Sequence, residues 1–230
     1  MMLGCRVVDT ENQALALRKR RRYTQAQRRA RSDRRMLDAA LKLIARQGSS
    51  RTTLAEIGKA SGYTYGLVTN RFGSKAALVR AVTRHVRSSF ARRAFPEVGN
   101  LSGIDALKAL IESYLANMDS VGRRALYVLI GEALGPVPEI RPDIADADES
   151  FRRNLQRHIE RGIASGEIRA GVDGGAQAAL LVATLRGISF QQLINPAAFD
   201  LKAVCAQLQA NVERALRPSG ANSGCRQEVH

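Results

Sequence analysis

The chain has 230 residues, of which 45% are apolar and 25% charged, and its formal net charge is +15. This composition is that of an ordinary globular protein, long enough for one large domain or for a small domain joined to a larger one. The longest apolar run, Ala178–Leu185, is too short to span a bilayer, and the first residues lack the pattern of a signal peptide. We therefore expect a cytoplasmic protein.

The positive charge is concentrated in the N-terminal part of the chain. Residues 1–94 hold 22 Lys and Arg against 5 Asp and Glu, a net of +17, whereas residues 95–230 hold 14 against 16, a net of −2. This asymmetry predicts a nucleic-acid-binding head on a neutral body. The three cysteines have no metal-ligand spacing, so we expect free thiols and no metal site.

Residues 1–31 are expected to form a disordered basic arm, with clusters at Arg18–Arg22 and Arg28–Arg31. Two interpretations stay open. The arm is either a solvated leader or a segment that lies along DNA phosphates or in a minor groove, where its contribution to binding would depend strongly on salt.

A first helix is expected over 32–47, because apolar residues recur there at helical spacing and Gly48 follows as a stop. The next stretch, Thr53–Lys75, reads TLAEIGKASGYTYGLVTNRFGSK and predicts two short helices joined by a tight turn. Thr53 and Glu56 form a capping box at the first of these helices, and Gly62 suits the positive φ that ends it.

Thr64 can cap the second short helix, whose Val68 and Phe72 face the core at spacing i, i+4. Two crossed helices of this kind form a helix-turn-helix, which presents its second helix to a DNA major groove. The residues expected to point outward from that helix are Tyr65, Gly66, Leu67, Thr69, Asn70 and Arg71.

Several of these side chains have the chemistry of base readout. Asn70 can pair with adenine and Arg71 with guanine, and the methyl groups of Leu67 or Thr69 can contact thymine. Tyr65 is the fifth candidate. The alternative is a polar helix face that is merely solvated.

The run from Met36 to Leu78 resembles the DNA-binding domain of the TetR family of bacterial regulators. The matching features are the threonine before the second helix, the small-small-Gly turn, the Gly and Phe of the third helix and the S-K that opens the fourth. They stand here as Thr53, Ala60-Ser61-Gly62, Gly66, Phe72 and Ser74-Lys75. The sequence departs from the family's usual residues at Leu67, Thr69, Asn70 and Arg71.

The resemblance implies that Thr53, Asn70 and Lys75 hold phosphates and that Tyr65, Leu67 and Thr69 lie nearer the bases. The complete set expected to bind DNA is Thr53, Thr64, Tyr65, Gly66, Leu67, Thr69, Asn70, Arg71 and Lys75.

The rest of the chain predicts helices and no strands. A helix from Ser74 to Phe95, ended by Pro96, would lead from the head into the body. Further helices are expected over 101–118, 123–134, 140–165, 173–194 and 200–217, with a disordered tail at 218–230. The expected fold is therefore all-α, with a three-helix DNA-binding domain at 32–78 and a helical effector-binding and dimerisation domain at 79–217.

The resemblance implies that the last two helices of two subunits form a four-helix bundle. The expected interface residues are Leu180, Leu181, Thr184, Gly187, Phe190, Val204, Leu208 and Val212. The alternative is that these residues belong to the core of one subunit.

An effector pocket with apolar walls and a few polar groups is expected within the body. Its candidate lining residues are Tyr114, Met118, Leu126, Tyr127, Ile130, Phe151, Leu155 and His158. Each of them has plain core packing as its alternative.

These features predict a homodimeric, ligand-responsive transcriptional regulator, a repressor released from a palindromic DNA operator by a small molecule. No H-E-x-x-H, G-x-S-x-G or glycine-rich phosphate loop is present, so neither enzymatic activity nor a cofactor is expected. Two alternatives remain. One is a nonspecific architectural DNA-binding protein that uses the basic arm, and the other is an all-helical carrier or enzyme with a vestigial head.

Overall fold

The computed structural model describes residues 24–98, 100–116 and 121–218, and all regular structure in these ranges is helical, as expected. The helices are α2 (Gln25–Gln47), α3 (Leu54–Ser61), α4 (Tyr65–Phe72), α5 (Lys75–Val98), α6 (Gly103–Ala116), α7 (Val121–Leu134), the short 3-10 turn η1 (Pro138–Ile140), α8 (Arg141–Ala164), α9 (Gly174–Ile194) and α10 (Leu201–Leu216). In these ranges no helix combines the length and the apolarity needed to cross a membrane.

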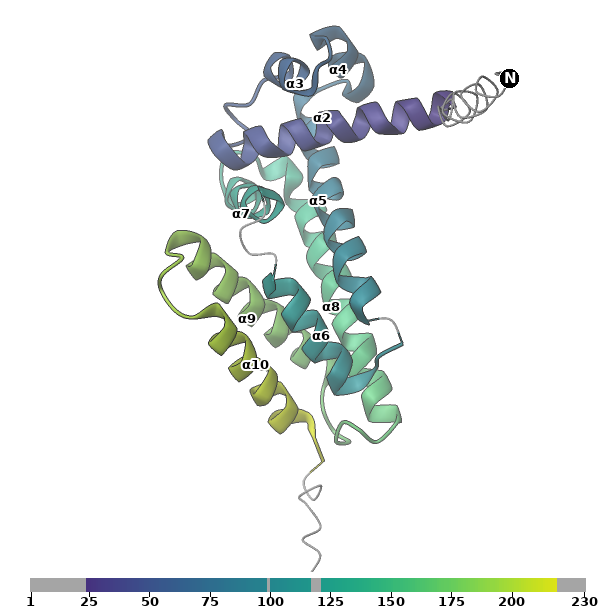
Figure 1. Ribbon diagram of the computed structural model, residues 1–230, viewed down its shortest axis with the longest axis vertical. Helices are drawn as coiled ribbons and strands as arrows, with labels where there is room; N and C mark the ends of the chain where they lie inside the picture. The colour runs from purple at the N-terminus through teal and green to yellow at the C-terminus, as the bar shows by residue number, and fades with distance from the viewer. Residues whose placement is uncertain (1–23, 99, 117–120, 219–230) are drawn as a thin grey trace, which may run out of the picture.

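The helices form a head and a body at opposite ends of an elongated molecule (Figure 1). Helices α2, α3 and α4 make the head, and α5 runs from the head down into the body. Helices α6, α8, α9 and α10 make the lower body, whereas α7 lies directly beneath α2. The helices are thus divided into a three-helix head and a helical body.

Local sequence signals position the two short helices of the head. The Thr53 hydroxyl accepts a hydrogen bond from the Glu56 amide, and the Glu56 carboxylate accepts one from the Thr53 amide, which confirms the capping box. Gly62 ends α3 in the left-handed conformation, with φ 78° and ψ 28°. The Thr64 hydroxyl then caps α4 by accepting a hydrogen bond from the Leu67 amide.

A glycine that the sequence analysis did not single out lets α3 and α4 approach each other. A Cβ atom on Gly58 would lie 2.9 Å from the carbonyl oxygen of Tyr63 and 3.2 Å from the amide nitrogen of Tyr65. A side chain at this position would therefore push the backbone of the turn away from α3. The signal in the sequence was a glycine inside a helix, which often marks a close approach.

Two helix boundaries differ from those expected by more than two residues. Helix α2 begins at Gln25 and not at Ser32, because Thr24 and Gln27 form a second capping box that the arginine-rich sequence obscured. Part of the expected disordered arm is thus helical, while the cluster Arg18–Arg22 and the tail 219–230 lie outside the described residues. Helix α5 continues through Pro96 to Val98, since a proline near a helix end removes only one backbone donor.

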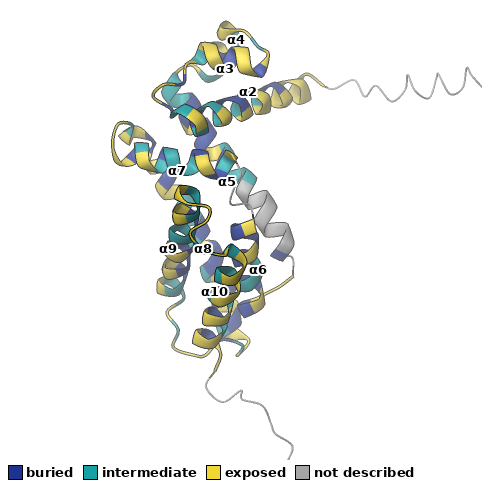
Figure 2. Ribbon diagram, turned by 60° about the vertical axis from the view of Figure 1, so that its left-hand side comes forward, coloured by how far each residue is buried: buried dark blue, intermediate teal, exposed yellow. Residues whose placement is uncertain are grey.

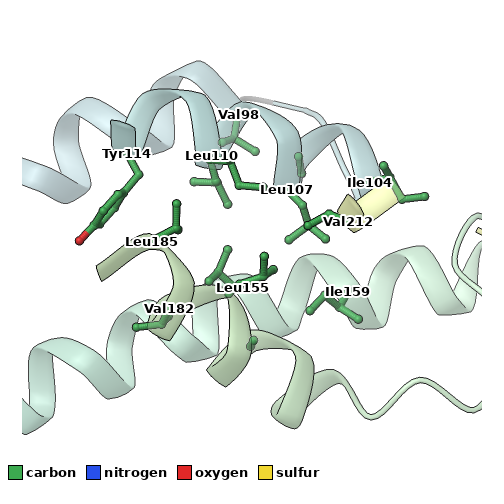
Figure 3. Close-up of a cluster of buried hydrophobic side chains, with 14 of the residues drawn as sticks. Val98, Ile104, Leu107, Leu110, Tyr114, Leu155, Ile159, Val182, Leu185 and Val212 are labelled. Atoms are coloured by element: carbon green, nitrogen blue, oxygen red, sulfur yellow. The ribbon is translucent and has the colours of Figure 1, made fainter. Parts of the chain in front are cut away.

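The apolar side chains form two clusters. The body cluster is built around α6, α8, α9 and α10, and Figure 3 shows side chains from these helices meeting in it. The head cluster joins α2, α3 and α4 to the first half of α5 and also to α7, η1 and the start of α8. Since Ala125, Leu129 and Ala133 of α7 are buried in the head cluster, the head is seated on α7 by shared apolar packing.

A hydrogen bond also joins the head to α7. The Glu132 carboxylate of α7 accepts a hydrogen bond of 2.8 Å from the Ser49 amide, just after the end of α2. The chain reaches this position through Gly48, whose φ of 81° and ψ of 161° lie in a region that essentially only glycine adopts. A Cβ atom on Gly48 would lie 2.9 Å from Oε1 of Glu132.

We expect Gly48→Ala to lower the free energy of unfolding by about 1–3 kcal/mol, because the alanine is strained at this φ and ψ and crowds the Glu132 carboxylate. Chemical denaturation measures the change. Gly131→Ala is the matched control, since Gly131 lies in α7 with no atom within 4 Å of an added Cβ. The control is expected to be neutral or to gain up to about 1 kcal/mol. Equal stability of the two variants would contradict the role assigned to Gly48.

Candidate DNA-binding face and effector region

The face of the head that points away from the body is formed by α3 and α4 (Figure 1). The side chains of Thr53, Thr64, Tyr65 and Asn70 are exposed there, and Gly66 between them is open to solvent. Tyr65 is 58% exposed although it is a large aromatic residue. Five of the nine residues expected to bind DNA are therefore exposed on α4 or at the N-caps of α3 and α4.

Leu67 and Thr69 do not point freely outward, which corrects the sequence-based expectation. Leu67 is partly buried and packs against the head cluster. Thr69 is also partly buried, and its hydroxyl has no hydrogen-bond partner among the described residues. A helix of only eight residues that turns one face to the core cannot leave six of its side chains in solvent.

Arg71 was also expected to point outward, but it is turned toward α2. Its Nη1 lies 3.0 Å from Oδ1 and 3.2 Å from Oδ2 of Asp33 and donates a hydrogen bond to Oδ2. The Arg71 side chain is only 17% exposed. The Arg71 guanidinium, which was expected to pair with guanine, instead links α4 to α2.

Lys75 lies at the start of α5, beside the loop that precedes α3. Its ammonium group donates a hydrogen bond of 2.6 Å to the Ser50 carbonyl oxygen. This contact holds the loop that leads to α3 against the N-terminal end of α5, where Lys75 is the first residue. Helix N-termini favour anions such as phosphate, so the place of Lys75 agrees with a phosphate contact.

In the body, the expected pocket residues divide between the two apolar clusters. Tyr114, Phe151 and Leu155 belong to the body cluster, whereas Leu126 and Ile130 pack against the head cluster. Leu126 and Ile130 lie in α7, which is seated under the head. Met118 lies outside the described residues.

A buried polar group that the sequence analysis missed lies among the first set. The Arg123 guanidinium, 6% exposed, is 4.0 Å from the centre of the Tyr114 ring, and Tyr114 stacks on Phe151 with ring centres 5.5 Å apart. Arg123 donates hydrogen bonds to the Tyr114 carbonyl oxygen and to the Ser189 hydroxyl. Burial lowers the pKa of Arg123, although the tyrosines next to it oppose the shift.

Two more of the expected residues are polar groups in apolar surroundings. The Tyr127 hydroxyl donates a hydrogen bond to the Arg186 carbonyl oxygen, and burial raises the pKa of Tyr127. His158 is buried, and its Nδ1 has no hydrogen-bond partner among the described residues. Burial lowers its pKa, as do the charges of Arg161 and Arg157. The body therefore contains aromatic, hydroxyl and cationic groups close to one another.

An open groove of about 440 Å³ lies elsewhere, on the head between α2 and α3. None of the expected pocket residues lines it. Its walls are Arg35, Asp38, Ala39, Lys42, Leu43, Arg46, Ala60 and Ser61.

The expected dimer residues also divide into two groups. Leu181 and Val212 are buried in the body cluster, and Leu208 packs against it, so these three belong to the core of the subunit, which corrects the expectation. Leu180, Thr184 and Phe190 are exposed on α9, and Gly187 beside them has no atom within 4 Å of an added Cβ. Val204 of α10 is half-buried.

Comparison with known proteins gives two family models and many structures. Residues 36–82 match the bacterial regulatory proteins of the tetR family, and residues 104–217 match the C-terminal domain of BetI-type transcriptional repressors. Among curated protein sequences, no significant match is found.

The fold is shared with solved regulators of low sequence identity. A TetR regulator from Chloroflexus aurantiacus J-10-FL has a TM-score of 0.74 at 22% identity, over 83% of this chain and 98% of that one. FadR from Bacillus subtilis, in complex with stearoyl-CoA, has a TM-score of 0.69 at 19% identity, over 79% and 98%. NalD, the secondary repressor of the MexAB-OprM efflux pump in Pseudomonas aeruginosa, has a TM-score of 0.62 at 22% identity, over 83% and 98%.

The two family models together span both the helix-turn-helix head and the helical body. The matched structures cover four-fifths of the chain with the same arrangement of helices. This protein belongs to the TetR family of bacterial transcriptional regulators.

Proposed function

We propose that this protein is a homodimeric, ligand-responsive repressor that binds a palindromic operator and is released from it by a small molecule, and that it has no enzymatic activity. The observation that carries the proposal is the exposed surface of the helix-turn-helix, where Tyr65 and Asn70 of α4 and Thr53, the N-cap of α3, are all exposed. Tyr65 and Asn70 can reach base edges, and the backbone amides at the start of a helix favour phosphates.

A two-fold operator requires two heads held at a fixed distance, which is about 34–36 Å for sites one turn apart. The exposed face of α9 supports dimerisation, because Leu180, Phe190 and Ile194 are 63%, 53% and 69% exposed. These residues share one side of the helix with Thr184 and Gly187. Large apolar side chains gathered on one helix face mark a protein interface more often than a solvated surface.

The polar group around Arg123 supports an effector site in the body. Arg123 lies near the start of α7, and Glu132, which holds the loop after α2, lies near its end. A ligand that displaces Arg123 or Tyr114 would therefore act on the same helix that seats the head. The neighbour FadR, crystallised with stearoyl-CoA, shows that a protein of this fold takes a small-molecule ligand.

Footprinting of the DNA next to the gene tests the operator. We expect protection of two half-sites related by two-fold symmetry, and release of the protein when the cognate effector is added to a gel shift. Binding without a protected two-fold site would favour the architectural alternative. Tight ligand binding or turnover without an effect on DNA would favour the carrier or enzyme.

The contribution of Arg71 to recognition is expected to act through Asp33. Arg71→Ala and Asp33→Ala should each lower the ratio of operator affinity to arbitrary-duplex affinity, and by a similar factor, because either change frees α4 from α2. The double variant should be no worse than either single variant, which is the behaviour of two residues that act as a unit. Fluorescence anisotropy on both duplexes measures the ratio.

Asn70→Ala is the comparison variant, since Asn70 is exposed and has no partner among the described residues that would be lost. It should cost about 1–3 kcal/mol of discrimination on the operator. If Arg71 reads a base directly, Arg71→Ala alone will lower the ratio and Asp33→Ala will leave it unchanged.

The dimer is expected to depend on the exposed face of α9. Leu180→Arg combined with Ile194→Arg should convert the protein to a monomer with weakened operator binding, because two charges would be buried in the interface. Sedimentation or native mass spectrometry measures the mass. Leu101→Arg, an exposed leucine outside α9, is the control and should stay dimeric. A double variant that is still a dimer would place the interface elsewhere.

A further inference from the structure

The first two turns of α2 are exposed along their whole length. All seven residues from Gln25 to Arg31 are exposed, and the first buried residue of the helix is Ser32. Seven helical residues extend about 10 Å, so a rod of this length projects beyond the head. Figures 1 and 2 show this end of α2 standing clear of α4 and α5.

The charge of this segment is unfavourable for a helix in water. Between Gln25 and Arg35 there are five arginines and one aspartate, Asp33, which is paired with Arg71. The first turn holds no acidic residue, and arginines at spacings of three and four repel each other. Arg28, Arg29 and Arg34 make no ion pair with any described residue.

Two contacts fix the direction of the segment relative to the reading helix. Asp33 is paired with Arg71 of α4, and the Arg35 guanidinium lies 5.8 Å from the centre of the ring of Tyr63, in the turn between α3 and α4. The projecting helix therefore moves together with α4 and is not an independent arm. When α4 enters a groove, the arginines of α2 are carried to a set position beside it.

We propose that the segment Gln25–Arg35 is a second DNA-binding surface, which contacts the phosphates that flank the operator on its outer side. The charge is complementary, since duplex DNA carries one negative charge per about 1.7 Å of its axis. The outer side follows from Figure 1, in which this end of α2 points away from α9 and α10. That direction rests on the proposed dimer through α9, whereas the phosphate contact itself does not.

The test compares the full-length protein with Arg28→Gln/Arg29→Gln/Arg34→Gln on an arbitrary 40-base-pair duplex and on the footprinted operator. Glutamine keeps the helix propensity and removes the charge. We expect the slope of log affinity against log salt to become shallower by about 2–3, because each lost phosphate contact changes it by about 0.9. On the operator, hydroxyl-radical protection should be lost at the outer flanks and kept at the half-sites.

The matched control is Arg153→Gln/Arg157→Gln/Arg161→Gln, which removes the same charge from exposed positions of α8 in the body. Its slope should equal that of the unchanged protein. Arg28→Lys/Arg29→Lys/Arg34→Lys should restore the slope, since a phosphate contact needs only the charge. An unchanged slope in the α2 variant, or an equal loss in the control, would overturn the proposal.

A failure of the phosphate-contact proposal can be distinguished from a failure of the proposed repressor function. Phosphate contacts do not depend on sequence, so the arbitrary duplex reports on the α2 segment even if no two-fold operator is found. Conversely, the α2 variant could give a two-fold footprint of unchanged length. That result would support the proposed repressor function and would contradict the proposed DNA-binding surface on α2.

Discussion

The contact between the end of α2 and α7 is the constraint on which the orientation of the head depends. Ala125, Leu129 and Ala133 of α7 are buried together with apolar residues of α2, and the Glu132 carboxylate accepts the amide hydrogen of Ser49. The apolar contacts fix the distance between the two helices, and the hydrogen bond fixes the start of the loop that leads to α3. Because α3 and α4 follow directly from this loop, the place of the reading helix is set by a helix of the body.

The same helix also reaches the buried polar group of the body. Arg123 and Glu132 are nine residues apart on α7, which separates them by about 13 Å along the axis. Within the described chain, α7 thus contacts both the buried polar group, through Arg123, and the loop after α2, through Glu132.

Three positions of α4 that were expected to face DNA make contacts inside the head instead. Arg71 is committed to Asp33, and Leu67 and Thr69 are partly buried. The exposed surface of α4 is therefore narrower than the sequence indicated, and it consists mainly of Tyr65, Gly66 and Asn70. The ion pair joins α2 to α4, so the orientation of α4 depends on a helix outside the helix-turn-helix.

The sequence by itself determined the two short helices of the head and their caps. The Thr53–Glu56 capping box, the positive φ of Gly62 and the Thr64 cap are interactions within a few residues, so local spacing was sufficient to predict them. It did not determine which outward-facing positions find a partner on another helix. Arg71 meets Asp33 across 38 positions of the chain, Ser49 meets Glu132 across 83 and Arg123 meets Ser189 across 66. Only the packing of whole helices brings such pairs together, because helical periodicity gives the side of a helix on which a residue lies but not the neighbour it faces.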